Sequence, residues 1–126
     1  MTASNRAIEF VQLAAEAASE KVAENLVALD VSEPMPLTDI FLIASGRNER
    51  QVMAISDGIE EKLLEHGVKL LRREGKTTGR WILLDFGDLI CHIFHEEERM
   101  YYSLERIWND CPVVPLATVP SPETIG

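Results

Sequence analysis

Residues 79–99, GRWILLDFGDLICHIFHEEER, bring together two aspartates, two histidines, a cysteine and three consecutive glutamates. Cysteine and histidine are common zinc ligands. Alternation along a strand, however, places Cys91 and His95 on one face and His92 on the other, so the two histidines cannot chelate one ion. We therefore expect no metal here, with His92 as a packed or hydrogen-bonded core residue and His95 as a surface residue at a helix start.

The two aspartates of this stretch are the groups that a metal-dependent nucleotidyl transferase would need. Such enzymes converge carboxylates on one ion, commonly from a D-x-D pair on one strand face. Asp85 and Asp88 are instead three positions apart and flank Gly87, so they bracket a turn. Three interpretations stay open: carboxylates that cap turn amides, an acidic tip that faces a partner, and catalysis.

A second place where chemistry is possible is the run SGRNER, residues 45–50. It ends an apolar strand and opens a helix, where backbone amides can bind a phosphate. Phosphate-binding loops normally contain several glycines, whereas this run has only Gly46. The pattern favours an ordinary capped turn, in which Arg50 and Gln51 can brace the loop.

Hydrophobic spacing predicts the elements that position these residues. The first helix begins after Ser4 and ends near residues 21–24, and the second runs from about Glu49 to His66, with a capping box at Asn48 and Gln51. Strands are expected over residues 25–31, 38–45, 68–74, 80–86 and 89–95, and a last helix begins at residues 96–98. This order predicts a single α/β domain over residues 1–110, with a mixed, mostly antiparallel five-stranded sheet and helices mainly on one face. Residues 111–126 are expected to form a proline-rich, mobile tail.

The strand that contains the tryptophan is apolar on both faces. Trp81, Leu83 and Asp85 share one face, and the other is lined by Ile82, Leu84 and Phe86. Three helices cannot easily cover both sides of a sheet. Either Trp81 belongs to the core, or it is the aromatic anchor of an interface with a charged rim.

Charge and composition limit the classes of function. The chain has 126 residues and a net charge of −9, and residues 85–110 carry seven acids against two arginines. Such a surface repels nucleic-acid backbone and favours a basic protein partner. Two cysteines make a disulfide framework improbable, and neither a membrane-length apolar run nor a signal peptide is present, so we expect a cytoplasmic protein without a cofactor.

Several short motifs together resemble one family. They are Thr38-Asp39 before an apolar strand, S-G-x-x-x-R-Q from Ser45, Glu74-Gly75, W-x-x-x-D-x-G-D from Trp81, H-x-F from His92, and Y-x-L-E-x-x-W from Tyr102. In combination they resemble the Iojap family of ribosomal silencing factors, over about residues 5–110. The proline-rich end lies outside the shared pattern.

The resemblance implies a non-enzymatic factor with a nucleotidyltransferase-like topology that lacks the catalytic carboxylates. It implies binding to the large ribosomal subunit through ribosomal protein fourteen, at the face where the small subunit joins. The expected result is lower translation, typically under nutrient limitation. Family members are also often homodimers, and neither DNA nor a membrane is an expected partner.

The resemblance also assigns a partner-binding surface. Its centre corresponds to Trp81, Leu83, Asp85 and Asp88, with Tyr102, Leu104 and Glu105 at its edge or in its packing. Two rival functions stay open: a nucleotidyltransferase-like enzyme, against which the missing D-x-D pair argues, and a homodimeric scaffold that uses the apolar strand face on itself.

Overall fold

The computed structural model describes residues 3–75, 80–98 and 110–118. Its elements, in chain order, are α1 (Asn5–Glu20), β1 (Glu24–Asp30), β2 (Ile40–Gly46), α2 (Glu49–Glu65), β3 (Arg72–Glu74), β4 (Trp81–Asp85) and β5 (Leu89–His95). Residues 96–98 form one helical turn after β5. Neither described helix is long and apolar enough to cross a membrane.

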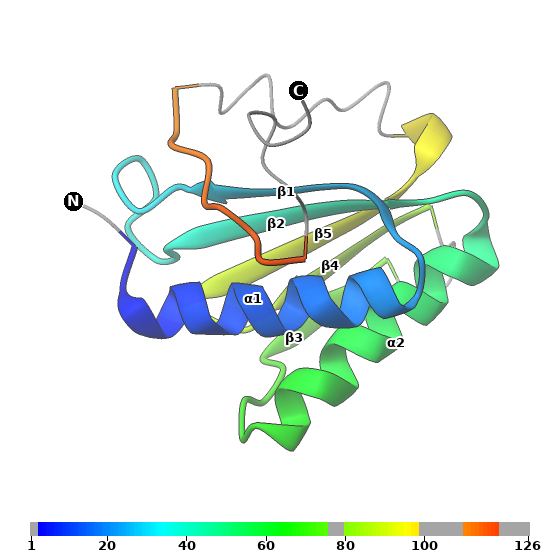
Figure 1. The fold of residues 1–126 in the computed structure, drawn as a ribbon, viewed down its shortest axis with the longest axis horizontal. Coiled ribbons are helices and arrows are strands. Elements are labelled where there is room, and N and C mark those ends of the chain that lie inside the picture. Colours follow the sequence, from blue (N-terminus) through cyan, green and yellow to red (C-terminus); the bar gives the residue numbers. More distant parts are fainter. Residues whose placement is uncertain (1–2, 76–79, 99–109, 119–126) are drawn as a thin grey trace.

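The five strands form one mixed sheet in the order β1-β2-β5-β4-β3. β2 and β5 are parallel, and the other three neighbouring pairs are antiparallel. α1 and α2 lie on the same side of this sheet (Figure 1). The prediction of a single α/β domain with a mixed, mostly antiparallel five-stranded sheet and helices mainly on one face is confirmed. The nucleotidyltransferase-like topology stays a prediction.

The main core lies between the sheet and the two helices. α1 contributes mostly alanines, which let it approach α2 and the strands closely, while α2 contributes larger apolar side chains such as Ile55 and Ile59. Lys62 of α2 forms ion pairs with Glu16 and Glu20 of α1 and so ties the two helices together at the surface.

The helix ends are close to those that the sequence predicts. The Ser4 hydroxyl accepts a hydrogen bond from the amide of Ala7, and the Asn48 side chain accepts one from the amide of Gln51. Gly67, at φ +79°, follows the end of α2 in a backbone conformation that suits glycine. These local signals therefore set both helices.

The strand expected over residues 68–74 is shorter than predicted. Pairing with β4 covers only Arg72–Glu74, because the chain is still finishing α2: the amide of Val68 donates to the carbonyl of Leu63. Leu70 then packs against the core, and Leu71 makes the first hydrogen bond to Asp85. The apolar run thus covers the core before it joins the sheet.

The expectation of a mobile tail after residue 110 is wrong for the part that the structure describes. The segment 110–118, hereafter the C-terminal segment, runs across β1 toward α1 (orange in Figure 1). Asp30 donates its amide to the carbonyl of Pro112, and Val114 donates to Ala28, so the segment pairs along the outer edge of β1. Val114 and Leu116 are buried in the main core. The prolines interrupt regular structure there without preventing packing.

This packing predicts a stability difference between neighbouring residues. Leu116 is 8% exposed, whereas Val113 is 67% exposed. Leu116→Ala should lower the free energy of unfolding by about 2 kcal/mol, because it leaves a cavity, while Val113→Ala should change it by less than about 0.5 kcal/mol. Urea unfolding measures both, and equal effects would show that the segment does not pack in solution.

Candidate functional site

Trp81 and Leu83 point to the face of the sheet that lies opposite the helices. Both are partly buried, whereas Ile82 and Leu84, on the other face of β4, are completely buried in the main core. The predicted alternation along this strand is therefore confirmed. Trp81 packs against a second, smaller apolar cluster that includes Phe41 and Phe94.

Four rings form the centre of this second cluster, and we call them the aromatic cluster: Phe41, Trp81, His92 and Phe94. The rings of Trp81 and Phe94 stack with centroids 4.9 Å apart. Phe41 meets His92 edge-on, also at 4.9 Å. The cluster spans β2, β5 and β4, so it joins the three strands at the middle of the sheet on the side away from the helices.

His92 is the polar member of the aromatic cluster and lies beneath Trp81. The Trp81 indole Nε1–H donates to His92 Nδ1 at 3.3 Å, and the His92 side chain is only 7% exposed. Burial lowers the pKa of His92 to about 4, so the ring is neutral near pH 7. Because Nδ1 accepts, the proton of the neutral ring lies on Nε2. Nε2 is buried and has no hydrogen-bond partner in the described part of the chain.

A shallow hollow of about 270 Å³ lies beside the tryptophan, lined by Glu74, Gly75, Trp81 and Leu83. Gly75 has a φ of +80°, and a Cβ atom there would lie 1.9 Å from the carbonyl oxygen of Trp81. Only glycine fits such an approach. This explains the Glu-Gly motif physically: the chain after β3 must pass directly against the backbone of Trp81.

The two aspartates lie at the other end of β4 from Trp81, around the turn into β5. Asp85 accepts a hydrogen bond from the Gly87 amide at 2.8 Å, and Gly87 has a φ of +92°. The turn-capping interpretation is thus confirmed for Asp85. Asp88 binds differently: its carbonyl accepts from the amides of Asp39 and Ile40, and its carboxylate lies 3.8 Å from Arg6.

The predicted site residues are therefore only partly brought together. Trp81 and Leu83 line one hollow, whereas Asp85 and Asp88 lie at the turn after β4 and are not among the residues that line it. Tyr102, Leu104 and Glu105 lie outside the described residues. Their assignment to the partner surface stays a prediction.

The glutamates after β5 are held by an arginine of the neighbouring strand end. Arg80 forms ion pairs with Glu97 and Glu98, at 3.0 and 2.8 Å, which raise the pKa of its guanidinium. His95 is 9% exposed, so the prediction of a surface residue is wrong, although it does stand at the helix start. Its Nδ1 accepts from the Glu97 amide and so caps the turn.

The SGRNER run is a capped turn whose anchor is Gln51. The Gln51 side chain accepts from the Arg47 amide and donates to the carbonyls of Lys21 and Val22, so it ties the start of α2 to the loop before β1. A Cβ on Gly46 would lie 3.0 Å from Val52. The glycine thus allows close packing of strand against helix, and the bracing role predicted for Gln51 is confirmed.

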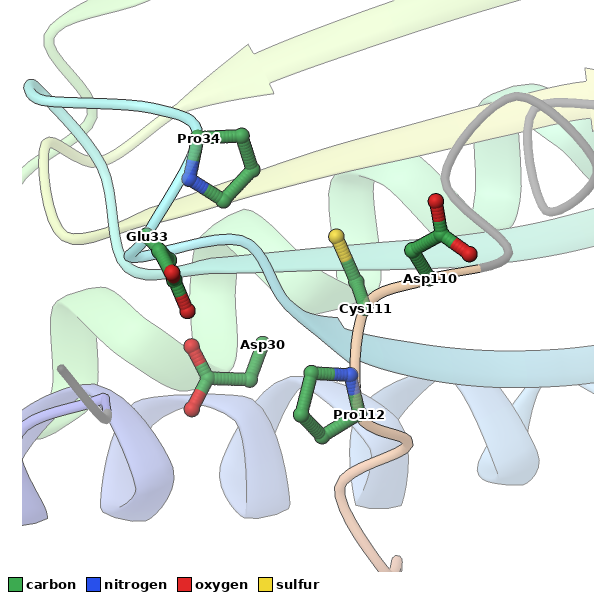
Figure 2. A pocket seen from close by; sticks show the side chains of 6 residues that line it. All are labelled: Asp30, Glu33, Pro34, Asp110, Cys111 and Pro112. Carbon is green, nitrogen blue, oxygen red and sulfur yellow. The ribbon is translucent and has the colours of Figure 1, made fainter.

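A further hollow, of about 310 Å³, is lined by acids and a thiol (Figure 2). Asp30 and Glu33 come from the end of β1 and the loop after it, and Asp110 and Cys111 come from the C-terminal segment. Burial, followed by the charges of Asp110, Asp30 and Glu33, raises the pKa of the Cys111 thiol. A protonated thiol is a poor nucleophile. Among the described residues, no group of three or more His, Cys, Asp or Glu side chains is placed to hold a metal ion.

Sequence reasoning missed Phe41, Phe94 and Glu74 as parts of the Trp81 surface. β2 and β5 are buried on both faces, so their apolar runs carry no alternation that shows which side chains face the helices. The pairing register of β4 with β5 could have identified Phe94, because it places Phe94 opposite Trp81. That register depends on the turn at Gly87.

Comparison with known proteins identifies the family. The model of a family described as "Ribosomal silencing factor during starvation" matches residues 4–125. This chain belongs to that ribosomal silencing factor family. The match extends over the C-terminal segment, in agreement with the packing of that segment on β1.

Two bacterial relatives are similar along nearly all of their length, and a mouse relative is similar along part of it. "Ribosomal silencing factor RsfS" of Halalkalibacterium halodurans is 42% identical over 111 residues, which are 88% of this chain and 95% of that protein. A crystal structure of a Chromobacterium violaceum protein has a TM-score of 0.78 at 30% identity and covers 94% of this chain and 97% of that one. The mouse protein "Mitochondrial assembly of ribosomal large subunit protein 1" is 30% identical over 69% of this chain and 40% of its own length.

The buried histidine of this silencing factor predicts a pH-dependent loss of stability. Its folded-state pKa of about 4 lies below the ordinary value of 6.5, so the unfolded chain binds the proton more tightly. The stability that the neutral imidazole contributes is fully present above pH 6.5. As the pH falls toward 4, protonation of the unfolded chain lowers the free energy of unfolding by up to about 3 kcal/mol. Urea unfolding from pH 7 to 4 should show that His92→Leu loses less stability than the wild type.

Carboxylates also titrate in this range, so the difference between the two proteins is the quantity to compare. The control is Leu64→Ala, because Leu64 is exposed on α2 and its side chain does not titrate. It should follow the wild-type curve. A His92→Leu curve parallel to the wild type would contradict burial of a neutral imidazole.

Proposed function

We propose that this protein binds the large ribosomal subunit through ribosomal protein fourteen and prevents the small subunit from joining. The result is lower translation under nutrient limitation. Membership of the ribosomal silencing factor family supports a ribosome-silencing role, and the family description itself refers to starvation. The name of the mouse relative refers to the ribosomal large subunit, which favours that subunit as the partner.

The observation that carries the proposal is the partly buried Trp81 beside a shallow hollow, on the side of the sheet away from the helices. Large aromatic side chains on a rigid strand are the usual anchors of protein interfaces. Trp81 and Leu83 form the apolar centre, and Glu74 supplies a carboxylate at its margin. The net charge of −9 favours a basic protein partner over nucleic acid.

A non-enzymatic function agrees with the way the acidic groups are used. The Asp85 carboxylate is bonded to the amide of Gly87, and Glu97 and Glu98 are paired with Arg80. These contacts stabilise turns and strand ends. The names of the bacterial relatives describe a silencing factor and not an enzyme. The bound protein then acts by occupying space that the small subunit requires.

Trp81→Ala should weaken binding to isolated large subunits about 30-fold, because truncation of an interface anchor costs about 2 kcal/mol or more. Co-sedimentation gives the Kd, and light scattering of mixed subunits reports subunit joining. Leu64→Ala is the matched control, since Leu64 is 58% exposed on α2, on the opposite side of the sheet. If the two variants bind alike, the interface lies elsewhere.

The same pair of variants tests the identity of the partner. Titration onto purified ribosomal protein fourteen should show the same ratio of Kd values as titration onto whole subunits. Sedimentation equilibrium of each variant measures self-association. Loss of self-association with unchanged subunit binding would favour the homodimeric scaffold instead.

Asp88, which the resemblance assigns to the partner surface, gives a separate prediction. Asp88→Lys should slow association with large subunits several-fold at low ionic strength, and the difference should fade in about 0.5 M salt, because exposed charges act by long-range steering. The control is Glu61→Lys, which makes the same charge change at an exposed position of α2. Stopped-flow association rates at several salt concentrations measure both. Equal slowing would attribute the effect to net charge alone.

A further inference from the structure

Trp81, Leu83 and Glu74 around the hollow are called the docking surface. We infer that His92 is a positioning residue for this surface: it holds the indole of Trp81 from below in the orientation that the partner meets. This inference rests on the proposed function, because it gives His92 a part in presenting the anchor. His92 itself touches no partner, since it is only 7% exposed.

Strand register places His92 where it can hold the indole. It stands opposite Leu83 of β4 on one side and beside Ile43 of β2 on the other. Phe41 packs edge-on against the imidazole, at 4.9 Å between ring centroids. The imidazole therefore sits in the middle of the sheet, where its neighbours fix the ring. Its Nδ1 receives the Trp81 Nε1–H at 3.3 Å, so a rigid acceptor sets one end of the indole.

Stacking on Phe94 does not set this orientation by itself. The two rings lie nearly parallel, with an angle of 28° between their planes. Stacked rings can slide and rotate in their plane at little cost, whereas a hydrogen bond is directional. Phe94 supports the flat side of the indole, and His92 defines which edge points inward. Together they present a preset apolar edge to the hollow beside Leu83.

His92 also lowers the stability of the fold. Its Nε2 is buried with no hydrogen-bond partner in the described part of the chain. An unpaired buried donor destabilises a protein, and an apolar side chain of similar size would avoid the penalty. Sites that break a local rule of stability in this way are expected where a residue serves function. A purely structural role would be better served by leucine.

Two variants of His92 distinguish the effect of its hydrogen-bond acceptor from the effect of its volume. His92→Asn keeps an acceptor, because its Oδ1 takes the approximate place of Nδ1, while His92→Leu keeps apolar volume without an acceptor. We expect His92→Leu to unfold at the same or higher urea concentration than the wild type near pH 7, yet to bind large subunits about fivefold to tenfold more weakly. His92→Asn should keep wild-type affinity within about threefold.

A spectroscopic readout follows the hydrogen bond itself. In a proton–nitrogen NMR spectrum, the Trp81 indole resonance is assigned by its loss in Trp81→Phe. It should keep its hydrogen-bonded, downfield position in His92→Asn and move upfield in His92→Leu. A role limited to core packing would leave the affinity of the folded His92→Leu protein at the wild-type value.

The outcomes distinguish this inference from the proposed function. If Trp81→Ala weakens binding and folded His92→Leu binds like the wild type, positioning by His92 is wrong and the docking surface stands. If Trp81→Ala itself binds like the wild type, the proposed docking surface is wrong, whatever the His92 variants do. If both His92 variants lose affinity equally, the acceptor is not what matters, and the inference is overturned.

Discussion

α1 and α2 lie against one face of the sheet, and the second apolar face of its middle strands is the constraint on which the rest of the described structure depends. β2 and β5 are buried on both sides, so side chains that turn away from the helices need cover of their own. Aromatic rings supply part of it: Phe41, Phe94 and Trp81 close over the middle strands with His92 among them. The outermost ring of this layer is partly buried, and an interface can form there without disturbing the main core.

Several chemical groups of residues 80–98 make local contacts that stabilise the fold. Asp85 holds the turn at Gly87, His95 caps the helical turn, and Arg80 binds the glutamates after β5. The stretch is crowded because it contains two strands, a turn and a helix start within a few residues. Its charged groups stabilise those transitions, and Trp81 stacks on Phe94 in the aromatic cluster.

The sequence predicts α1 and α2, the strand order along the chain and the alternation of β4, since each depends on neighbours in sequence. Asn48, Gln51 and Gly67 act locally, and their effects can be foreseen. The aromatic cluster could not be foreseen, because Phe41 and Phe94 belong to strands without alternation and are joined only by tertiary register. The C-terminal segment was misjudged for a related reason: proline content describes local backbone, whereas Val114 and Leu116 are held by a core formed far away in sequence.

The pairing of the C-terminal segment with β1 has a consequence for how the chain is made. β1 is an edge strand, and residues 112–114 cover its outer side. These residues follow all five strands in the chain, so a growing chain exposes the bare edge of β1 until they have been synthesised. An unpaired strand edge invites association with other chains. Premature termination before residue 112 therefore yields a protein with an open sheet edge, prone to aggregate even though most of its core residues are present.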